Sequence, residues 1–365
     1  NSLNNIVDQM NTTVYNHSHT DSNLETLLNQ MNTTLYNHSH AELETLLNHS
    51  HAELETLLNQ INTTLYAHSH VNKWTIETMY TDTGGSAVKY SADNSYIIGG
   101  NLNYDHIFIY NISTGAYTII AGQSGNPGSA DGVGTDATFD YPEAIGVSPD
   151  GTYVLIGGRN NHCIRRLELS NYSVTTPYGQ CGPSEYLDGI GTLARFQNIK
   201  GISISPDGNF AAVTDHGSSN SYIRLIELAT ANVTTLADST TDSVTTPYGI
   251  DYSPDGMSIV FTEYSTDKIR LINVSTGQVT TIVSSNSDIN GPWDIAYTPD
   301  GQHAVVGDLI NEELVLLDMN TYQTTGLNTN TKGRGVDVSN DGNYALYEYN
   351  GVIKNITLKK IILYA

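Results

Sequence analysis

One tetrapeptide, Ser/Thr-Pro-Asp-Gly, recurs along most of this 365-residue chain and limits the folds that it can adopt. Successive copies lie 57, 57, 48, 45 and 41 residues apart, with short apolar and Thr-rich runs between them. Proline presets φ and Asp-Gly tolerates a positive φ, so each copy predicts a tight turn between two strands. Four strands in each period of this length predict a mainly β fold, a six-bladed β-propeller. Four copies are complete and two are degenerate, and they begin at Ser91, Ser148, Ser205, Ser253, Thr298 and Ser339.

Two of these repeats carry a longer motif before the turn. It reads DGVGTDATF from Asp131, and a second copy begins with DGIG at Asp188 and reaches Phe196. These units resemble NHL repeats, and the shorter units resemble YVTN (YncE-like) propellers, so the resemblance covers residues 74–365. It implies the propeller fold but says little about function, because such propellers include binding modules, scaffolds and a few enzymes. Asp131 and Asp136 leave open a Ca²⁺ loop, although a simple turn is the favoured interpretation.

Two segments compete to close the ring of blades. Residues 74–80 (WTIETMY) form a good candidate strand before the first turn, and residues 360–364 form another after the last. The sequence leaves the choice open. A closing strand from the N-terminal side would join both ends of the propeller in one blade, and the other segment would then be free to pair with a neighbouring subunit.

Near residues 71–74 the chain changes character, which divides it into a repetitive segment, residues 1–72, and the propeller, residues 73–365. Apolar residues of the first segment are spaced alternately by four and three, which predicts a long amphipathic, coiled-coil-like α-helix. A lone helix cannot bury such a seam, so the chain is expected to assemble with itself. The seam comprises Val7, Met10, Val14, Leu24, Leu28, Met31, Leu35, Leu43, Leu47, Leu54, Leu58, Ile61 and Leu65.

Other features of this segment oppose a helix. Its NTT and NHSH pieces are poor helix formers, and it has no Lys or Arg for pairing between helices, so a disordered tail is the alternative. Four His-x-His pairs also lie here, and His17, His38 and His68 fall on the seam. Imidazoles at i and i+2 do not share a helix face. We therefore expect no metal site, and metal binding by these three would need neighbouring copies of the chain.

The two cysteines, Cys163 and Cys181, are symmetric about a predicted hairpin turn near residue 172. Facing positions on adjacent strands come within bridging distance. A disulfide is therefore favoured over two unrelated buried thiols, and it indicates an oxidising compartment.

Many asparagines stand in Asn-x-Ser/Thr sequons. Four of them, Asn111, Asn171, Asn232 and Asn273, recur at the expected hairpin between the third and fourth strands of a blade. Repeated use of an outer position predicts N-linked glycans, with no other cofactor, and a secreted protein of a surface appendage or matrix. The full set of predicted sites is Asn11, Asn16, Asn32, Asn37, Asn48, Asn62, Asn111, Asn171, Asn232, Asn273 and Asn355.

A ring of polar and aromatic residues is expected at one end of the central channel. Aromatic side chains beside charged ones suit a sugar or a small polar ligand. The alternative, which we favour, is that Glu143 and Lys200 on adjacent blades pair and plug the channel. The ring consists of the residue five positions before each turn Ser or Thr: Ser86, Glu143, Lys200, Tyr248, Trp293 and Arg334.

Charge and motifs disfavour several functions. The net charge of −23 opposes binding to nucleic acid or to an anionic membrane surface, and no apolar run is long enough to span a membrane. We find no nucleophile elbow, HExxH, Walker loop or Cys/His metal spacing, so we expect no enzyme. Propeller hydrolases of the resembled kind use channel-facing acids around a metal, and only Glu143 has a matching position.

The sequence thus predicts a secreted structural glycoprotein, a subunit of an extracellular filament or surface appendage that assembles through its N-terminal helix. A filament is favoured over a trimeric stalk. The alternative is a lectin-like or adhesive, glycan-binding propeller on an oligomeric stalk, using Tyr248 and Trp293. A second alternative is a propeller hydrolase or lactonase.

Overall fold

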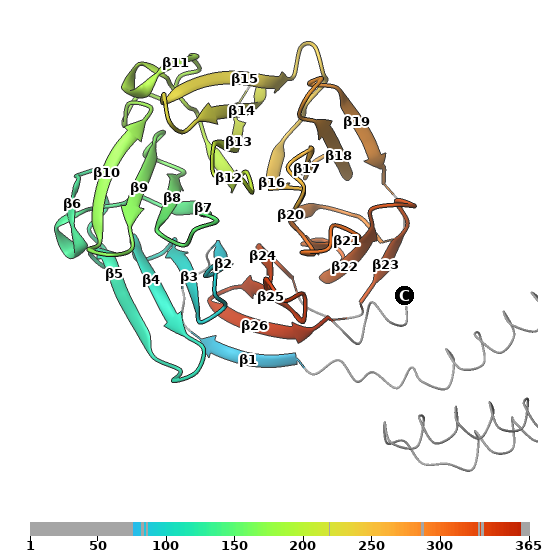
Figure 1. The fold of residues 1–365 in the computed structure, drawn as a ribbon, viewed down its shortest axis with the longest axis horizontal. Helices are drawn as coiled ribbons and strands as arrows, with labels where there is room; N and C mark the ends of the chain where they lie inside the picture. The colour runs from blue at the N-terminus through green and yellow to red at the C-terminus, as the bar shows by residue number, and fades with distance from the viewer. Residues whose placement is uncertain are drawn as a thin grey trace, which may run out of the picture. The chain divides into compact units, whose positions relative to one another are not determined.

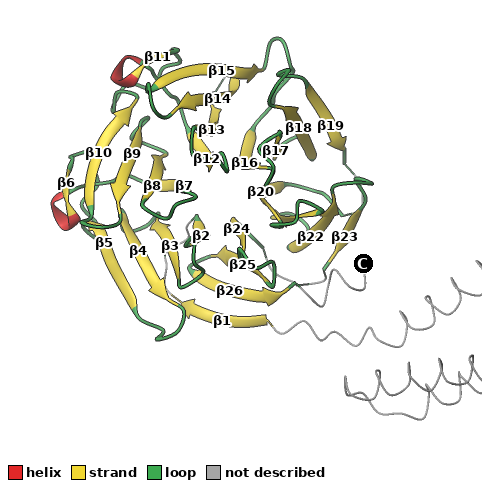
Figure 2. Cartoon of the chain, viewed as in Figure 1, coloured by secondary structure: helices red, strands yellow, loops and turns green. Residues whose placement is uncertain are grey.

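A computed structural model describes residues 76–358 except 82–83, 85–86, 219, 286–287, 328 and 330–331. Within these residues, six antiparallel sheets surround a central channel (Figure 1), and strands predominate (Figure 2). The predicted mainly β, six-bladed propeller is therefore confirmed. No helix of the described part of the chain is long and apolar enough to cross a membrane. The N-terminal helix, its seam and the seam histidines lie outside the described residues and stay predictions.

Each blade is a meander whose first strand lines the channel, and blades 2 and 3 carry an extra short strand outside the fourth. Blade 1 contains β2 (Val88–Tyr90), β3 (Tyr96–Asn101), β4 (His106–Asn111) and β5 (Tyr117–Gly122). Blade 2 contains β7 (Pro142–Val147), β8 (Tyr153–Gly158), β9 (Ile164–Glu168) and β10 (Ser173–Tyr178), with β6 (Gly132–Val133) outside. Blade 3 contains β12 (Ile199–Ile204), β13 (Phe210–His216), β14 (Ser221–Glu227) and β15 (Asn232–Asp238), with β11 (Gly189–Ile190) outside.

The remaining three blades have four strands each. Blade 4 contains β16 (Pro247–Tyr252), β17 (Ser258–Glu263), β18 (Lys268–Asn273) and β19 (Val279–Val283). Blade 5 contains β20 (Pro292–Tyr297), β21 (His303–Asp308), β22 (Glu313–Asp318) and β23 (Thr324–Gly326). Blade 6 contains β24 (Gly335–Val338), β25 (Tyr344–Tyr349), β26 (Val352–Thr357) and β1 (Ile76–Thr81). Two short 3₁₀ turns, η1 (Gly134–Asp136) and η2 (Gly191–Leu193), follow β6 and β11.

The recurring tetrapeptide forms the predicted turn between the first two strands of a blade. In blade 3, Ser205 Oγ donates to Asp207 Oδ1 at 2.6 Å and accepts from the N–H of Phe210 at 2.9 Å. Gly208 has φ +71°, which glycine adopts without steric cost. Hydrogen bonds from Ser205 and Asn209 lower the pKa of the Asp207 carboxyl. The turn thus supplies its own polar partners and needs none from the rest of the fold.

The meander gives the propeller two different faces. Turns between the first and second strands and hairpins between the third and fourth share one end of every blade, here called the turn face. Hairpins between the second and third strands share the other end with the segments that enter each blade, here called the mouth face. A residue's place along the meander therefore decides which face it occupies.

An N-terminal strand closes the ring. In blade 6, β1 pairs antiparallel with β26, from Ile76 opposite Ile356 to Thr81 opposite Val352. The Tyr80 ring also stacks on Tyr117 of blade 1, with centroids 4.6 Å apart. Of the two candidate strands, the one near residues 74–80 is thus used, and residues 360–364 lie outside the described part.

Apolar side chains fill the spaces between adjacent sheets. Between blades 2 and 3, Leu155 and Tyr178 share one buried cluster with Phe196, Ile199 and Ile202. Phe196 belongs to the second long motif and is fully buried. The motif's aromatic residue thus anchors a blade-entering segment in the core.

Candidate functional site

The predicted ring of residues assembles at the mouth face, where the first strands begin. Lys200 Nζ lies 2.8 Å from Glu143 Oε2, and the two side chains are only 3% and 11% exposed. The expected pair between blades 2 and 3 is therefore present. Ser86 lies outside the described residues, so its place in the ring stays a prediction.

Aromatic side chains cover the next part of the ring. The Tyr248 and Trp293 ring centroids are 4.3 Å apart, and Tyr264 lies 5.4 Å from each of them. Lys200 Nζ lies 5.1 Å from the centre of the Tyr248 ring, so the ion pair borders the aromatic cluster. Tyr264 was not among the predicted site residues, because it comes from the hairpin after β17 and not from a first strand.

Arg334 completes the ring from blade 6. Its guanidinium lies over Trp293 at 5.4 Å and over Tyr349 at 5.8 Å. Its Nε is buried and has no hydrogen-bond partner among the described residues. The two aromatic faces thus hold a cation whose polar groups are not used within the described structure.

Positive charge gathers around this ring. Burial lowers the pKa of Lys200, the paired Glu143 opposes this shift, and the charges of Arg159 and Arg334 make smaller lowering contributions. Burial and the charge of Lys200 likewise lower the pKa of His216, whose ring centroid lies 6.1 Å from that of Tyr248. Three cations, Lys200, Arg159 and Arg334, thus lie near one another at the mouth, with Glu143 as the carboxylate beside Lys200.

The ring residues Glu143, Lys200, Trp293 and Arg334 line a small cavity of about 20 Å³, together with others that include Lys89 and Asp294. A cavity of this size has room for a water molecule but not for a sugar. A ligand of the mouth would therefore rest on the rim, against Trp293 and Arg334.

Further into the channel, three carboxylates join the first strands of successive blades. Lys89 Nζ lies 3.3 Å from Asp337 Oδ1 and donates to the carbonyl of Val336 at 3.1 Å. Lys89, Asp251 and Asp337 each stand two positions before a turn serine. A charged residue at this channel-facing position is the sequence signal that could have identified them. Asp251, Asp294 and Asp337 accept from the backbone N–H groups of Tyr297, Val336 and Tyr90, at 2.8, 2.8 and 2.7 Å respectively.

These carboxyls bind protons more tightly in the folded protein. Desolvation in the channel raises the pKa of Asp251 to about 6, although Lys89 and hydrogen bonds oppose the shift. Desolvation also raises the pKa values of Asp294 and Asp337. A folded-state pKa above the unfolded value near 4 means that Asp251 adds stability as the pH falls from about 6 toward 4, and that this contribution is lost above pH 6.

Asp251→Asn should therefore flatten the pH dependence of stability. We expect the wild-type protein to gain more unfolding free energy between pH 7 and pH 5 than the variant does, measured by urea denaturation at both pH values. Asp255→Asn is the matched control. Hydrogen bonds from Ser253 and Met257 lower the pKa of the Asp255 carboxyl, so it titrates below this range. Equal gains in wild type and Asp251→Asn would contradict the assignment.

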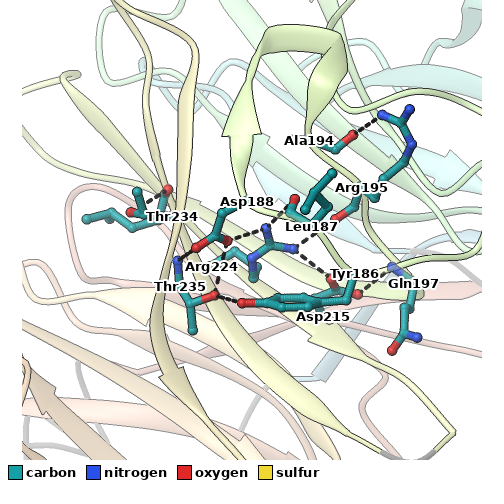
Figure 3. Close-up of polar contacts among 11 residues, drawn as sticks. Tyr186, Leu187, Asp188, Ala194, Arg195, Gln197, Asp215, Arg224, Thr234 and Thr235 are labelled. Carbon is teal, nitrogen blue, oxygen red and sulfur yellow. Dashed lines mark hydrogen bonds and ion pairs between the residues drawn. The ribbon is translucent and has the colours of Figure 1, made fainter.

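A fully buried arginine holds each long motif in place, as Figure 3 shows for Arg224 on β14. Arg165 on β9 holds the first motif in the same way, with Nη2 2.8 Å from Asp131 Oδ1. The first Asp of each motif, Asp131 or Asp188, is thus an ion-pair partner, and Asp136 lies in the 3₁₀ turn η1. Among the described residues, no group of three or more His, Cys, Asp or Glu side chains is placed to hold a metal ion. Arg224 donates to Asp188 Oδ1 at 2.8 Å, Leu187 O at 3.0 Å, Arg195 O at 2.9 Å and Asp215 Oδ2 at 3.2 Å.

No protein-family model matches the chain, and no curated protein matches it. Similar solved structures include a gluconolactonase from Xanthomonas campestris, with 11% identity, a TM-score of 0.59 and coverage of 80% of this chain and 92% of that one. A chain of Kuenenia stuttgartiensis hydrazine synthase matches with 16% identity, a TM-score of 0.53 and coverage of 79% and 98%. A chain of the nidogen/laminin complex matches with 13% identity, a TM-score of 0.55 and coverage of 69% and 84%. The chain is a six-bladed β-propeller.

At these identities the likeness shows the fold alone. The propeller fold that the resemblance of the repeats implies is thus present, and the repeat family itself stays a prediction. One of the neighbours is a gluconolactonase, and the expectation that this propeller is not an enzyme stays a prediction.

The predicted disulfide is present. Cys163 and Cys181 are bonded, with Cα atoms 4.9 Å apart. Cys163 lies just before β9 and Cys181 just after β10. The bond therefore joins the two ends of the β9–β10 hairpin at the mouth face. The bond fixes the segment that leads from β10 toward the second long motif.

The four hairpin sequons lie where the repeats predict, between the third and fourth strands. Asn171 and Asn273 are exposed, whereas Asn111 and Asn232 are half-buried. Asn355 differs because it lies inside β26, between two paired strands, and its Oδ1 accepts from the Tyr90 hydroxyl at 3.2 Å. The other predicted sites, Asn11, Asn16, Asn32, Asn37, Asn48 and Asn62, lie outside the described residues.

Proposed function

We propose that this chain is a secreted structural glycoprotein, a subunit of an extracellular filament or surface appendage that assembles through its N-terminal segment and displays the propeller. The observation that best supports this role is the common position of four sequons. Asn111, Asn171, Asn232 and Asn273 all belong to turn-face hairpins of successive blades. Glycans there would coat one face of the propeller and leave the mouth face bare.

The local geometry of these asparagines suits modification. Asn111 Oδ1 accepts from Ser113 Oγ at 2.8 Å, and Asn273 Oδ1 accepts from Ser275 Oγ at 2.7 Å. These contacts fix the side-chain oxygen on the sequon hydroxyl, and neither amide nitrogen has a hydrogen bond to another described residue. The nitrogen that would carry a glycan thus stays available, and the disulfide supports the same oxidising compartment.

Material purified from its natural source tests the proposal. Site-specific mass spectrometry should find glycans on Asn111, Asn171, Asn232 and Asn273. Asn355 should be largely unmodified, because its side chain lies within a paired strand and contacts Tyr90. Negative-stain images of the same preparation should show filaments or larger assemblies.

Two results would count against this role. Unmodified asparagines at all four hairpins would remove the argument for secretion. Discrete single propellers in the images would contradict a filament subunit and leave a monomeric or small oligomeric protein.

The aromatic and cationic rim favours a second candidate, a saccharide-binding module on the mouth face. Tyr248, Tyr264 and Trp293 form a compact aromatic cluster beside Arg334. Aromatic faces bind the apolar faces of sugar rings, while charged and polar groups at the edge fix orientation. Saccharide binding that is lost in Trp293→Ala would support this role, and binding unchanged in that variant would remove it.

A further inference from the structure

The guanidinium of Arg334 has hydrogen-bond donors that the described fold does not use, as a ligand-binding group would. Its guanidinium has five N–H donors, yet none of them donates a hydrogen bond to another described residue. Buried Arg165 and Arg224, by contrast, each donate to carboxylates and carbonyls. The Nε atoms of Arg165, Arg224 and Arg270 are buried without a partner as well, so Arg334 differs in that its two Nη groups also make no hydrogen bond within the described residues and remain available to a ligand.

The charges around Arg334 favour a negatively charged ligand. Arg159 and Arg334 both lie close enough to Lys200 for their charges to lower its pKa. Lys200 itself is paired with the Glu143 carboxylate. The side chain of Arg159 is exposed and makes no hydrogen bond or ion pair with another described residue. Arg159 and Arg334 therefore offer an anion two cations that no described carboxylate pairs, whereas the three Asp carboxylates of the channel lie further in, each on a backbone N–H group.

The shape of the rim restricts the partner further. Trp293 and Tyr248 provide two aromatic faces next to Arg334, tilted by 58° to each other, and Trp293 and Arg334 help to line a cavity of about 20 Å³. A ligand with a ring against Trp293 and an acidic group at the edge of that ring fits this arrangement. A planar guanidinium pairs with a carboxylate through two parallel hydrogen bonds.

We propose that the mouth face binds an acidic saccharide, with a sugar carboxylate on Arg334 and the sugar ring on Trp293. This inference rests on the saccharide-binding role and names its ligand class. Lys200 stays paired with Glu143, and Arg159 supplies long-range attraction. The affinity should therefore fall as the salt concentration rises.

Calorimetric titration of the full chain with a galacturonic acid tetramer tests the inference. The acid should bind at least ten-fold more tightly than its methyl ester, which has the same ring but no charge. Arg334→Gln should lose at least ten-fold in affinity. Arg166→Gln, the same change at an arginine on β9 paired with Glu168, should bind like wild type.

A second measurement locates the bound sugar. The chain has two tryptophans, so Trp74→Phe leaves Trp293 as the source of tryptophan fluorescence. The emission of this variant should change on addition of the tetramer and should stay constant when Arg334→Gln is also present. A thermal unfolding curve for each variant shows that a loss of binding does not come from unfolding.

The outcomes separate the inference from the role on which it rests. Equal binding of the acid and its ester would overturn the acidic ligand but keep a saccharide-binding rim. Tighter binding of a sulfated galactose tetramer would overturn the carboxylate in favour of a sulfate ester. Failure of all three sugars to bind the folded protein would overturn both the ligand class and the saccharide-binding role.

Discussion

Replacing Arg224 with methionine should lower the free energy of unfolding by about 3–5 kcal/mol, the largest loss that we expect from a single side chain in this propeller. Methionine keeps much of the volume but removes every donor. Asp215, which is fully buried, would lose its cation, and the carbonyls of Leu187 and Arg195 would lose a hydrogen bond. Equilibrium urea denaturation measures the loss.

A matched control is available in the same region. Arg166→Met breaks an ion pair with Glu168 whose side chains are 31% and 36% exposed, so it should cost less than about 1 kcal/mol. Burial raises the pKa of Asp215, so Asp215 should take up a proton in the Arg224→Met variant, and the loss should shrink at acidic pH. Similar losses for the two variants would show that the buried contacts of Arg224 do not stabilise the fold.

Removing the disulfide should have the second largest effect and lower the free energy of unfolding by about 3 kcal/mol. The bond joins residues 18 apart, and closing a loop of this length restricts the unfolded chain by about that free energy. A variant with Cys163→Ala and Cys181→Ala should show the loss in urea denaturation. Alanine is the suitable replacement because Cys163 is fully buried and a serine hydroxyl would need a partner there.

A thiol reductant provides the control for this prediction. It should lower the stability of the wild-type protein to that of the double variant and leave the variant itself unchanged. Wild-type stability that does not respond to complete reduction would contradict a stabilising role for the bond.

Local patterns were enough to predict much of this fold. The turn tetrapeptide supplies its own hydrogen bonds, as Ser205 and Asp207 show. The turn that it forms can therefore be predicted without knowledge of the rest of the chain. The disulfide and the Glu143–Lys200 pair followed from the symmetry of a hairpin and from a repeated strand position. Each of these features is set within one blade or between two adjacent blades.

The features that were not predicted depend on contacts between blades, and some of them on closure of the ring. Lys89 and Asp337 are 248 positions apart in sequence and meet because blade 6 lies beside blade 1. Tyr264 and Tyr349 reach the mouth from hairpins whose direction depends on the twist of each sheet. The choice of closing strand was open because both candidate segments have similar apolar patterns, and it is the pairing of β1 with β26 that shows which one is used.

The position of β1 also determines how the propeller responds to tension. Any pull through the residues that precede Ile76 enters the propeller at β1, which pairs with β26 along its length. A pull along the strand loads this row of hydrogen bonds together, whereas a sideways pull breaks them one at a time from Ile76. Stacking of Tyr80 on Tyr117 holds the far end of the strand against blade 1. The same domain would thus resist axial load and yield to peeling.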